Sequence, residues 1–488
     1  MSEERRRVLI AAFDALRPDM VTPGLMPNLA AFAQAGVRFT HSRAAFPTET
    51  RVNQATLVTG CYATRHGIVG NKFFDPVAAP GKPIISGDDT QLAAADRRLR
   101  GKLLDAPALG EMLAAHGMVL AVIGTGTAGG TRVLHHKAEG LGGFRLAMHR
   151  PDASVPADRI EAVIERIGPI PDFAIPALGW LTYATDVYLD YVEPELSPDV
   201  SIIWFCEPDD SYHNCGIGAE ANLAALRHAD AEFGRILSWR DRSRIGDRLQ
   251  IITMSDHGQL SVAHEALGLA GRLTAAGFAA GETISDQADA ALTSGDTAAI
   301  YVRDSDPARI RAIVDWLHAQ PWCGPVITRD GRGTLSHAQL GIAHRRAPDI
   351  GLVLASDDAV NSHGLPGSCQ HDSPYPVGGG VHGGLHPIEL GNWLAAGGDA
   401  FRSGLESELP SGIVDVLPTV LDILGLEPPP SVQGRVLGEA LRGHAGEPVP
   451  PASQEIFTAE NADGLRTRLS ISRVGATEYI ERGWVERA

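Results

Sequence analysis

The sequence predicts an α/β protein with a mostly parallel central sheet that is covered by helices on both faces. Two observations predict this fold class. Short aliphatic runs alternate with longer stretches of helical periodicity along most of the 488 residues, which is typical of parallel sheets joined by helical crossovers. Three of the aliphatic runs are also followed within three residues by an aspartate, at the edge of the sheet where such proteins bind their ligands.

The expected elements follow in chain order. Strands are expected where Val, Ile and Leu dominate a short run, at residues 8–13, 37–40, 119–123, 200–206 and 249–254. Helices are expected where the apolar period is helical, at residues 27–35, 107–115, 156–167, 171–192, 219–238 and 413–424. Pro107 in the first turn and Gly117 beyond the end support the helix between them.

The later part of the chain predicts a second structural unit. Residues 298–302, 307–319 and 325–328 predict a compact β-α-β unit, and residues 349–354 predict a further strand. We therefore expect three parts, listed by residue range: a core of residues 1–259 and 376–448, an inserted cap subdomain of residues 260–375, and a peripheral C-terminal segment of residues 449–488 that holds a hairpin.

Three stretches predict irregular structure. Residues 71–104 predict a surface excursion, and residues 362–384, dense in Gly, Pro, Ser and His, predict a mobile loop. The sequence GTGTAGG at residues 124–130 predicts a plain connection after a strand, because it lacks the spacing of a phosphate-binding loop.

The composition limits the classes of partner. The chain is 44% hydrophobic and 21% charged, as in ordinary soluble globular proteins, and its net charge is −17. This charge argues against a nucleic-acid polymer or a membrane as the main partner and favours a bound cation. A homo-oligomer stays open.

Cysteine content and terminal sequence predict the compartment. Five cysteines without C-x-x-C spacing argue against a disulfide framework and favour a reducing compartment. The apolar run after the arginines at residues 5–7 is too short for an export signal, and no stretch approaches the roughly 18 apolar residues of a membrane span. We therefore expect a cytoplasmic protein.

The segment at residues 46–71, FPTETRVNQATLVTGCYATRHGIVGN, organises the chain. Thr48, Thr50 and Asn53 offer two hydroxyls and an amide near a helix start, where backbone N–H groups favour an anion. Gly60 is placed to end the helix. Taken alone, the segment predicts only a capped helix.

Metal-binding residue types gather near the expected strand ends. Asp209 and His213 are four residues apart, so one helical turn directs both at one cation. Asp256 and His257 are adjacent in S-D-H-G, Asp14 ends the first strand, and His382 lies within G-G-G-V-H-G-G. Each could separately be a surface ion pair, a helix cap or a turn residue, but together and in this order they form a pattern.

The pattern resembles the alkaline phosphatase superfamily, and most closely its nucleotide pyrophosphatase/phosphodiesterase branch. The motifs that carry the resemblance span about residues 8–441 and are A-F-D-A-L-R-P, F-P-T-E-T-R-V-N, L-V-T-G, R-H-G-I-V-G-N, E-P-D-D-S-Y-H, S-D-H-G, G-V-H-G and D-V-L-P-T-V-L-D-I-L-G-L. The resemblance implies an alkaline phosphatase-like fold and two divalent metal ions, usually Zn²⁺. The ligands that it implies are Asp209, His213 and His382 for one metal, and Asp14, Asp256 and His257 for the other.

The resemblance also implies roles around the reacting phosphate. Thr48 is expected to be the nucleophile and to touch the second metal, and Asn53 to hold a non-bridging phosphate oxygen. A cation makes a threonine hydroxyl nucleophilic, and two cations can stabilise the attacking and leaving oxygens. The further expected substrate-binding residues are Asn71, Phe74, which can stack a flat group or pack in the core, and Arg51, which can contact an extra phosphate oxygen or lie on the surface.

Two residues qualify the resemblance. Glu49 stands where this branch usually carries Lys, and a carboxylate there disfavours a highly charged substrate. His371 is the reserve metal ligand.

The sequence therefore predicts a two-metal phosphohydrolase that cleaves phosphodiester or pyrophosphate bonds of small molecules through a covalent phospho-threonine intermediate. A phosphonoacetate hydrolase-like enzyme that cleaves C–P bonds, or a phosphomonoesterase, is the alternative on the same metal site. Sulfatase chemistry is argued against because T-E-T-R lacks the C-x-P-x-R pattern. A non-catalytic binding protein on this scaffold is argued against because all six ligands are present.

Overall fold

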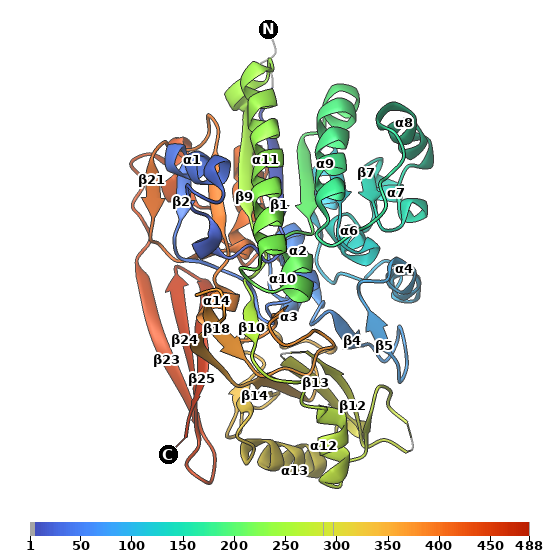
Figure 1. The fold of residues 1–488 in the computed structure, drawn as a ribbon, viewed down its shortest axis with the longest axis vertical. Helices are drawn as coiled ribbons and strands as arrows, with labels where there is room; N and C mark the ends of the chain where they lie inside the picture. The colour runs from blue at the N-terminus through green and yellow to red at the C-terminus, as the bar shows by residue number, and fades with distance from the viewer. Residues whose placement is uncertain (1–4, 286, 296, 488) are drawn as a thin grey trace.

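A central sheet of eight strands forms the upper half of the molecule (Figure 1). The computed structural model describes residues 5–285, 287–295 and 297–487. The sheet has the order β21-β2-β20-β9-β1-β8-β6-β7. Its strands are β1 (Arg7–Phe13), β2 (Val37–Phe39), β6 (Leu120–Gly124), β7 (Phe144–Ala147), β8 (Val200–Phe205), β9 (Leu249–Met254), β20 (Leu394–Gly397) and β21 (Leu405–Ser407). The run from β9 to β7 is parallel and β20 is antiparallel to its neighbours, so the predicted fold class is confirmed.

Helices cover both faces of this sheet, because alternate residues of its strands point to opposite sides. Leu9, Ala11 and Phe13 of β1 join one apolar cluster, and Val8, Ile10 and Ala12 join the other. The helices on the first face are α1 (Pro27–Ala35), α8 (Ala157–Ile167), α9 (Leu178–Val187) and α11 (Glu220–Arg242). The helices on the second face are α2 (Thr50–Thr59), α4 (Asp89–Arg98), α5 (Leu109–Ala114), α6 (Ala128–Leu134) and α15 (Val416–Ile423).

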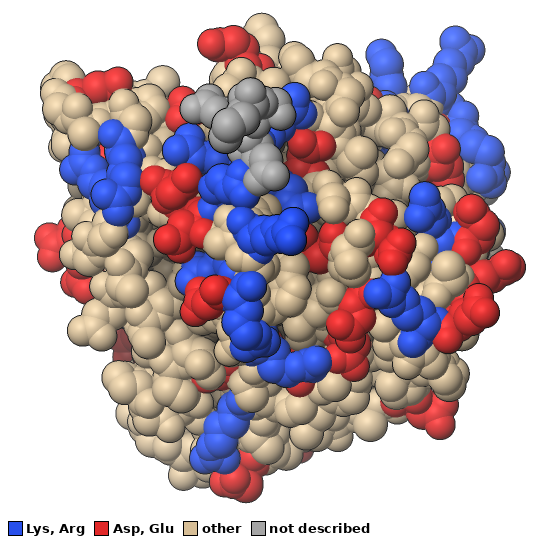
Figure 2. Space-filling view, turned by 90° about the horizontal axis from the view of Figure 1, so that it is seen from above, with Lys and Arg blue, Asp and Glu red and all other residues tan. Residues whose placement is uncertain are grey.

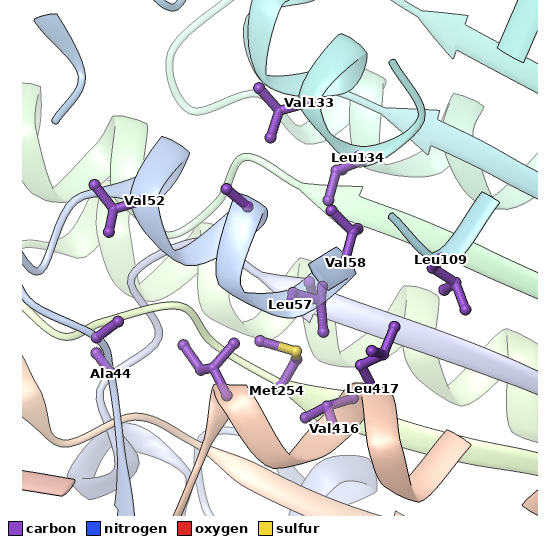
Figure 3. Close-up of a cluster of buried hydrophobic side chains, with 14 of the residues drawn as sticks. Ala44, Val52, Leu57, Val58, Leu109, Val133, Leu134, Met254, Val416 and Leu417 are labelled. Atoms are coloured by element: carbon purple, nitrogen blue, oxygen red, sulfur yellow. The ribbon is translucent and has the colours of Figure 1, made fainter. Parts of the chain in front are cut away.

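Helix α2 is the most deeply enclosed of the helices near the strand ends. Every residue from Thr50 to Thr59 except Arg51 is buried. Figure 3 shows Val58 beside Leu134 of α6, and Leu57 near Leu417 of α15. Gly60 ends the helix in the left-handed conformation, with φ of 62°, as its position in the sequence predicts.

A second sheet lies below the central one in Figure 1 and has its own apolar core. It has six strands, β11 (Ala280–Gly281), β12 (Ala290–Ser294), β13 (Thr297–Val302), β14 (Cys323–Thr328), β15 (Leu335–Ser336) and β16 (Ile350–Leu354). Two helices accompany it, α12 (Leu269–Ala275) and α13 (Pro307–His318). The chain divisions predicted from the sequence stay predictions.

The loop expected at residues 362–384 is in part a sheet. It contains β18 (Pro366–Cys369) and β19 (Gly380–Val381), which both pair with β10 (Leu260–Val262), while β17 (Ser356–Val360) pairs with β18. β18 and β19 lie more than 100 residues after β10 in the chain, so the local composition of the loop does not reveal that they pair with it.

Three further segments differ in detail from the prediction. The excursion at residues 71–104 holds the pair β4 (Lys72–Phe74) and β5 (Pro83–Ile85) before α4. The stretch GTGTAGG runs into α6, which Thr127 caps by accepting from the N–H of Gly130. The C-terminal segment holds the expected hairpin within a three-stranded antiparallel sheet, with β23 (Ala452–Glu460), β24 (Arg466–Val474) and β25 (Thr477–Glu486).

Short elements complete the chain. They are β3 (Ser42–Arg43), α3 (Ala63–His66), α7 (Ala138–Leu141), a π-helical turn (Tyr188–Leu196) that continues α9, α10 (Asp209–Cys215), α14 (Pro387–Leu390) and β22 (Ser411–Gly412). Within the described residues, no helix is both long enough and apolar enough to cross a membrane. Figure 2 shows the end of the molecule nearest the N-terminus, where acidic and basic side chains are intermixed.

Candidate active site

Three adjacent strands deliver carboxylates to one edge of the central sheet. β1 pairs in parallel with β8 and with β9, with Phe13 opposite Phe205 and Ala12 opposite Met254. Asp14, Asp209 and Asp256 follow these strand ends within a few residues, so the parallel register alone brings them together. Ala15, next to Asp14, has a φ of 60° and donates its N–H to Asp256 Oδ1 at 2.9 Å. This strained turn fixes the two carboxylates relative to each other.

The first cluster consists of Asp209, His213 and His382, whose ligand atoms all lie within 4.8 Å of one another. Asp209 and His213 lie on one turn of α10, with His213 Nε2 3.2 Å from Asp209 Oδ1. His382 follows β19 and places its Nε2 3.7 Å from the same oxygen. The structure therefore brings together the three residues predicted to share one metal.

The second cluster consists of Asp14, Asp256 and His257, with the same spread of at most 4.8 Å. His257 Nε2 lies 3.2 Å from Asp256 Oδ2 and 3.8 Å from Asp14 Oδ1. The two clusters touch, because the rings of His257 and His382 stack with centroids 3.8 Å apart.

The second cluster fits a cation because two of its buried oxygens lack a partner. Asp14 Oδ2 accepts from Trp204 Nε1 at 2.8 Å, and Asp256 Oδ1 accepts from backbone N–H groups. Asp14 Oδ1 and Asp256 Oδ2 are buried and have no hydrogen-bond partner. Buried anionic oxygens without a partner are costly, and a metal ion satisfies both.

The histidines are oriented as metal ligands. His213 Nδ1 is 2.6 Å from the carbonyl oxygen of Gly380, His382 Nδ1 is 2.7 Å from that of Thr48, and His257 Nδ1 is 3.1 Å from that of Gly258. A carbonyl accepts the proton of Nδ1, so Nε2 keeps its lone pair for a cation. Burial lowers the pKa of His257 and of His382 to about 4, so both rings are neutral near pH 7.

The carboxylates of the two clusters repel one another. Burial, together with the charges of Asp256 and Asp209, raises the pKa of Asp14 well above its ordinary value. Burial also raises the pKa of Asp256. Burial opposes the ionisation of Asp209 as well, but the nearby imidazoles of His213 and His382 lower its pKa. Bound cations would remove the repulsion, and the mixed nitrogen and oxygen donors suit Zn²⁺.

The geometry favours Thr50 over Thr48, the residue that the sequence predicts as nucleophile and metal contact. Thr48 Oγ1 donates to the carbonyl oxygen of Gly384 at 3.1 Å and accepts from the N–H of Gly383 at 3.0 Å. These two hydrogen bonds of the Thr48 hydroxyl stabilise the loop that carries His382. Thr50, the first residue of α2, instead places Oγ1 3.3 Å from His257 Nε2.

The hydrogen bonds of Asn53 argue against the predicted contact with a phosphate oxygen. Asn53 is fully buried, its Oδ1 accepts from the N–H of Ala45 at 2.8 Å, and its Nδ2 donates to carbonyls of Ala45 and Glu49, both at 3.2 Å. The amide therefore holds the turn that precedes α2 and has no capacity left for substrate.

Asn71 has the free donor that Asn53 lacks. Its Oδ1 accepts from the backbone N–H of Arg51 at 3.1 Å, so its Nδ2 is turned the other way. Glu49 accepts from the backbone N–H of Asn71. The carboxylate that appeared to disfavour anionic substrates is thus used to position Asn71, a role that sequence reasoning missed.

A cavity of about 340 Å³ opens over both Thr50 and the first cluster. It lies between the strand ends of the central sheet and the second sheet. The lining includes Thr50, Arg51, Asn71, Lys72, Asp209, His213, Tyr375 and His382, together with Thr293–Gly295 and Thr297–Ala299 of the β12–β13 hairpin. Thr48 and Asn53 do not line it.

The cavity is lined by the aromatic residues Phe46 and Tyr375 and not by Phe74. Phe74 is buried against Tyr301, with ring centroids 4.6 Å apart, and does not line the cavity. Tyr375 stacks on His213 with centroids 3.9 Å apart and an interplanar angle of 12°. Sequence reasoning missed it because it lies in a Pro-rich loop, although an aromatic residue seven positions before His382 was a usable signal.

Two further polar residues complete the account. His371, the reserve ligand, belongs to neither cluster, since Nδ1 contacts Ser373 Oγ at 2.8 Å and Nε2 contacts the carbonyl oxygen of His264 at 2.9 Å. Gln259 is fully buried, and its Nε2 donates to Asp209 Oδ1 and lies 3.4 Å from His213 Nε2. Gly380 makes room for it, because an added Cβ would meet Gln259 Oε1 at 2.1 Å.

Comparison with known sequences gives consistent matches. The model of the family described as "Type I phosphodiesterase / nucleotide pyrophosphatase" matches residues 8–358. Bis(5'-adenosyl)-triphosphatase enpp4 of Xenopus laevis is 25% identical over 262 residues, which are 53% of this chain and 48% of that protein. The venom phosphodiesterase of Naja atra is 23% identical over 242 residues, 49% of this chain and 24% of that protein. The chain thus spans about half the length, or less, of these curated relatives.

Solved structures show the same fold. The murine ectonucleotide pyrophosphatase/phosphodiesterase 5, as an inactive threonine-to-alanine variant in complex with AMP, superposes with a TM-score of 0.60. The identity is 18%, and the alignment covers 88% of this chain and 96% of that one. A second structure of the murine protein superposes with a TM-score of 0.61 at 17% identity. At these identities the likeness establishes the fold.

Proposed function

The chain belongs to the type I phosphodiesterase and nucleotide pyrophosphatase family, and we propose that it hydrolyses phosphodiester or pyrophosphate bonds of small molecules with Thr50 as the nucleophile. The membership agrees with the branch of the alkaline phosphatase superfamily that the motifs predict. The observation that carries the proposal is the position of Thr50 Oγ1, which faces the cavity 3.3 Å from His257 Nε2 and beside both clusters.

Two divalent cations, most simply Zn²⁺, are proposed cofactors. Asp209, His213 and His382 would hold one, and Asp14, Asp256 and His257 the other. When bound, such ions lower the pKa of a coordinated hydroxyl and neutralise charge on phosphoryl oxygens.

The residues of the chain supply the remaining parts of the mechanism. Thr50 Oγ1 gives up its proton to solvent and forms a bond to phosphorus while the bond from phosphorus to the leaving oxygen breaks, which gives a phospho-threonine ester and releases a leaving group that takes up a proton from solvent. A water oxygen then bonds to phosphorus as the bond from phosphorus to Oγ1 breaks, which releases the phosphoryl product, and Oγ1 takes up a proton to restore the hydroxyl. Asn71 Nδ2 donates to a non-bridging oxygen of the phosphoryl group, and Glu49 keeps Asn71 in place through its backbone N–H.

The comparisons support this reading in two ways. The related proteins are named as a triphosphatase of dinucleotides and as a phosphodiesterase. The murine protein of similar fold is described as inactive after a threonine-to-alanine substitution and as binding AMP, which supports a threonine nucleophile and a substrate of nucleotide size.

The test compares the two threonines directly. Thr50→Val and Thr48→Val each remove one hydroxyl and keep the side-chain shape. Bis-nitrophenyl phosphate, nitrophenyl thymidine monophosphate and nitrophenyl phosphate serve as substrates, and metal content is measured by elemental analysis. We expect two bound metal ions, a preference for the diesters, and a loss of kcat of at least about 10³-fold in Thr50→Val only.

Other outcomes change the proposal in defined ways. An equal or larger loss in Thr48→Val would return the nucleophile to that residue. A preference for nitrophenyl phosphate would keep the site and replace the diester by a monoester. Protein that binds no metal and keeps its activity in Thr50→Val would refute the mechanism.

A further inference from the structure

We propose that Arg51 is an anion-binding residue that selects substrates with a second anionic group, a phosphate or a carboxylate, close to the phosphoryl group that is cleaved. The proposal rests on the function proposed above and adds a substrate class to it. Arg51 follows the nucleophile Thr50 in the first turn of α2, and it lines the same cavity.

The guanidinium of Arg51 has no partner among the described residues. Its Nε is buried without a hydrogen bond, and the structure gives its side chain no ion pair in the described ranges. The fully buried arginines behave differently: Arg17, Arg145 and Arg346 each form an ion pair, with Asp19, Glu139 and Asp75 respectively. A half-buried cation without a counter-ion is costly unless a ligand supplies one.

The neighbouring carboxylates are committed to other partners. Glu49 is hydrogen-bonded to the backbone of Asn71, Asp14 belongs to one of the two metal clusters, and the side chain of Asp210 is hydrogen-bonded to Cys206. With a cation in its cluster, the charge of Asp14 is neutralised, and Arg51, which lines the cavity, can bind a further anion.

The guanidinium of Arg51 lies next to α6. An added Cβ at Gly130 would meet Arg51 Nη1 at 3.3 Å and Gln54 Oε1 at 2.8 Å. The glycine at this position of the GTGTAGG stretch thus lets α6 approach α2 closely. A planar guanidinium matches the two oxygens of a carboxylate or phosphate.

The cavity has room for the second group. Its volume of about 340 Å³ lies within the range of small-molecule sites. Lys72, also in the lining, is exposed, so it adds a mobile charge without a fixed geometry. Arg51 is therefore the cation that can distinguish one anionic group from another.

The experiment uses three diesters with the same nitrophenyl leaving group. The second alcohol is propyl, carboxyethyl or phosphonooxyethyl, so the three compounds differ in the second anionic group. We expect the full-length enzyme to show at least about tenfold higher kcat/KM for one charged diester than for the propyl diester. The charged compound that is preferred identifies the anion as carboxylate or phosphate.

The variants assign this preference to Arg51. In Arg51→Met the ratio of charged to neutral kcat/KM should fall to about one, and Arg51→Lys should keep part of it. Lys72→Met is the matched control and should change the ratio less than twofold. Arg51→Gln is a second variant without the positive charge. A thermal unfolding measurement for every variant shows whether a lower kcat/KM ratio is due to misfolding.

Three results would overturn the proposal. They are equal kcat/KM for all three diesters in the unmodified enzyme, an equal loss on all three in Arg51→Met, and a loss of the ratio in Lys72→Met as large as in Arg51→Met. None of these results contradicts the function proposed above. That function fails separately, if the enzyme cleaves none of the diesters.

Discussion

At the scale of single residues, the site is built by side chains that hold other side chains. Glu49 fixes the backbone of Asn71, and Trp204 fixes one oxygen of Asp14. Gln259 reaches Asp209 and His213 from just beyond β9. Such outer partners commonly tune a metal site as strongly as some ligands do. Gln259 is not itself a proposed ligand, so it can be replaced while all six proposed ligands are kept.

Replacing Gln259 by Leu should weaken Zn²⁺ binding at the cluster of Asp209, His213 and His382. The hydrogen bond from Nε2 to Asp209 Oδ1 is then lost, and we expect about tenfold lower affinity for one of two ions. A competition titration of metal-free protein against a chromophoric chelator measures this. Gln250→Leu, at the other end of β9 and equally buried, is the control; unchanged affinity in Gln259→Leu would disprove the role.

At the scale of elements, the sequence could predict an element when the residues that cause it lie within the element itself. The strand at residues 8–13 is buried on both faces, so its aliphatic run is visible in the sequence. β18 and β19 exist only through pairing with β10, so local composition indicated a loop. The same limit applied to the choice between Thr48 and Thr50, because T-E-T offers two hydroxyls and the contacts of Thr48 with the loop that follows β19 are not visible in the sequence.

The clustering of the six candidate metal ligands could be predicted for the opposite reason. Asp14, Asp209 and Asp256 follow parallel strands, whose ends meet by topology. The roles of Asn53 and Asn71 could not be separated, since both are asparagines close to α2, and only their partners in space distinguish a structural amide from a free one.

Helices α2 and α3 are joined by a buried histidine that should make stability depend on pH. His66 Nδ1 accepts from the N–H of Ile68 at 3.1 Å, and its Nε2 lies 3.1 Å from Thr56 Oγ1. Burial lowers the pKa of His66 to about 3. The neutral ring is therefore favoured in the folded state, and its contribution is complete above about pH 6.5 and is lost as the pH falls.

Between pH 6.5 and pH 4, this group should reduce the free energy of unfolding by up to about 1.4 kcal/mol per pH unit. His66→Asn should remove that part of the slope, as measured by denaturant unfolding at several pH values. His41→Asn at the exposed residue His41 is the comparison. If the slope of His66→Asn equals that of the unmodified protein, the ring does not carry it.

At the scale of the whole molecule, a buried arginine joins the chain between two strands of the second sheet to segments that surround α2. Arg346 lies between β15 and β16, is fully buried, and places Nε 2.7 Å from Asp75 Oδ2. Its Nη1 donates to the carbonyl oxygens of Gly67 at 2.9 Å and Leu103 at 2.8 Å. One guanidinium thus ties three separate segments around α2 to the part of the chain that walls the cavity.

Arg346→Met should lower the free energy of unfolding by about 3–5 kcal/mol, because the buried carboxylate of Asp75 loses its buried cationic partner. Equilibrium denaturant unfolding measures the loss. Arg345→Met is the comparison: Arg345 is 43% exposed, pairs with Asp105 and lies 3.8 Å from the same Asp75 oxygen, so the loss of this exposed cation should cost less than about 1 kcal/mol. Similar losses in the two variants would show that the buried ion pair contributes no more than the exposed one.

The two sides of the cavity come from different stretches of chain. The reacting groups stand at the ends of β1, β8 and β9 and at the start of α2, whereas the opposite wall comes from the β12–β13 hairpin. Random mutagenesis restricted to that hairpin would therefore alter which alcohol or nucleotide is accepted while leaving the bond-breaking machinery intact. A directed-evolution library should therefore vary the hairpin residues and keep the residues at the strand ends unchanged.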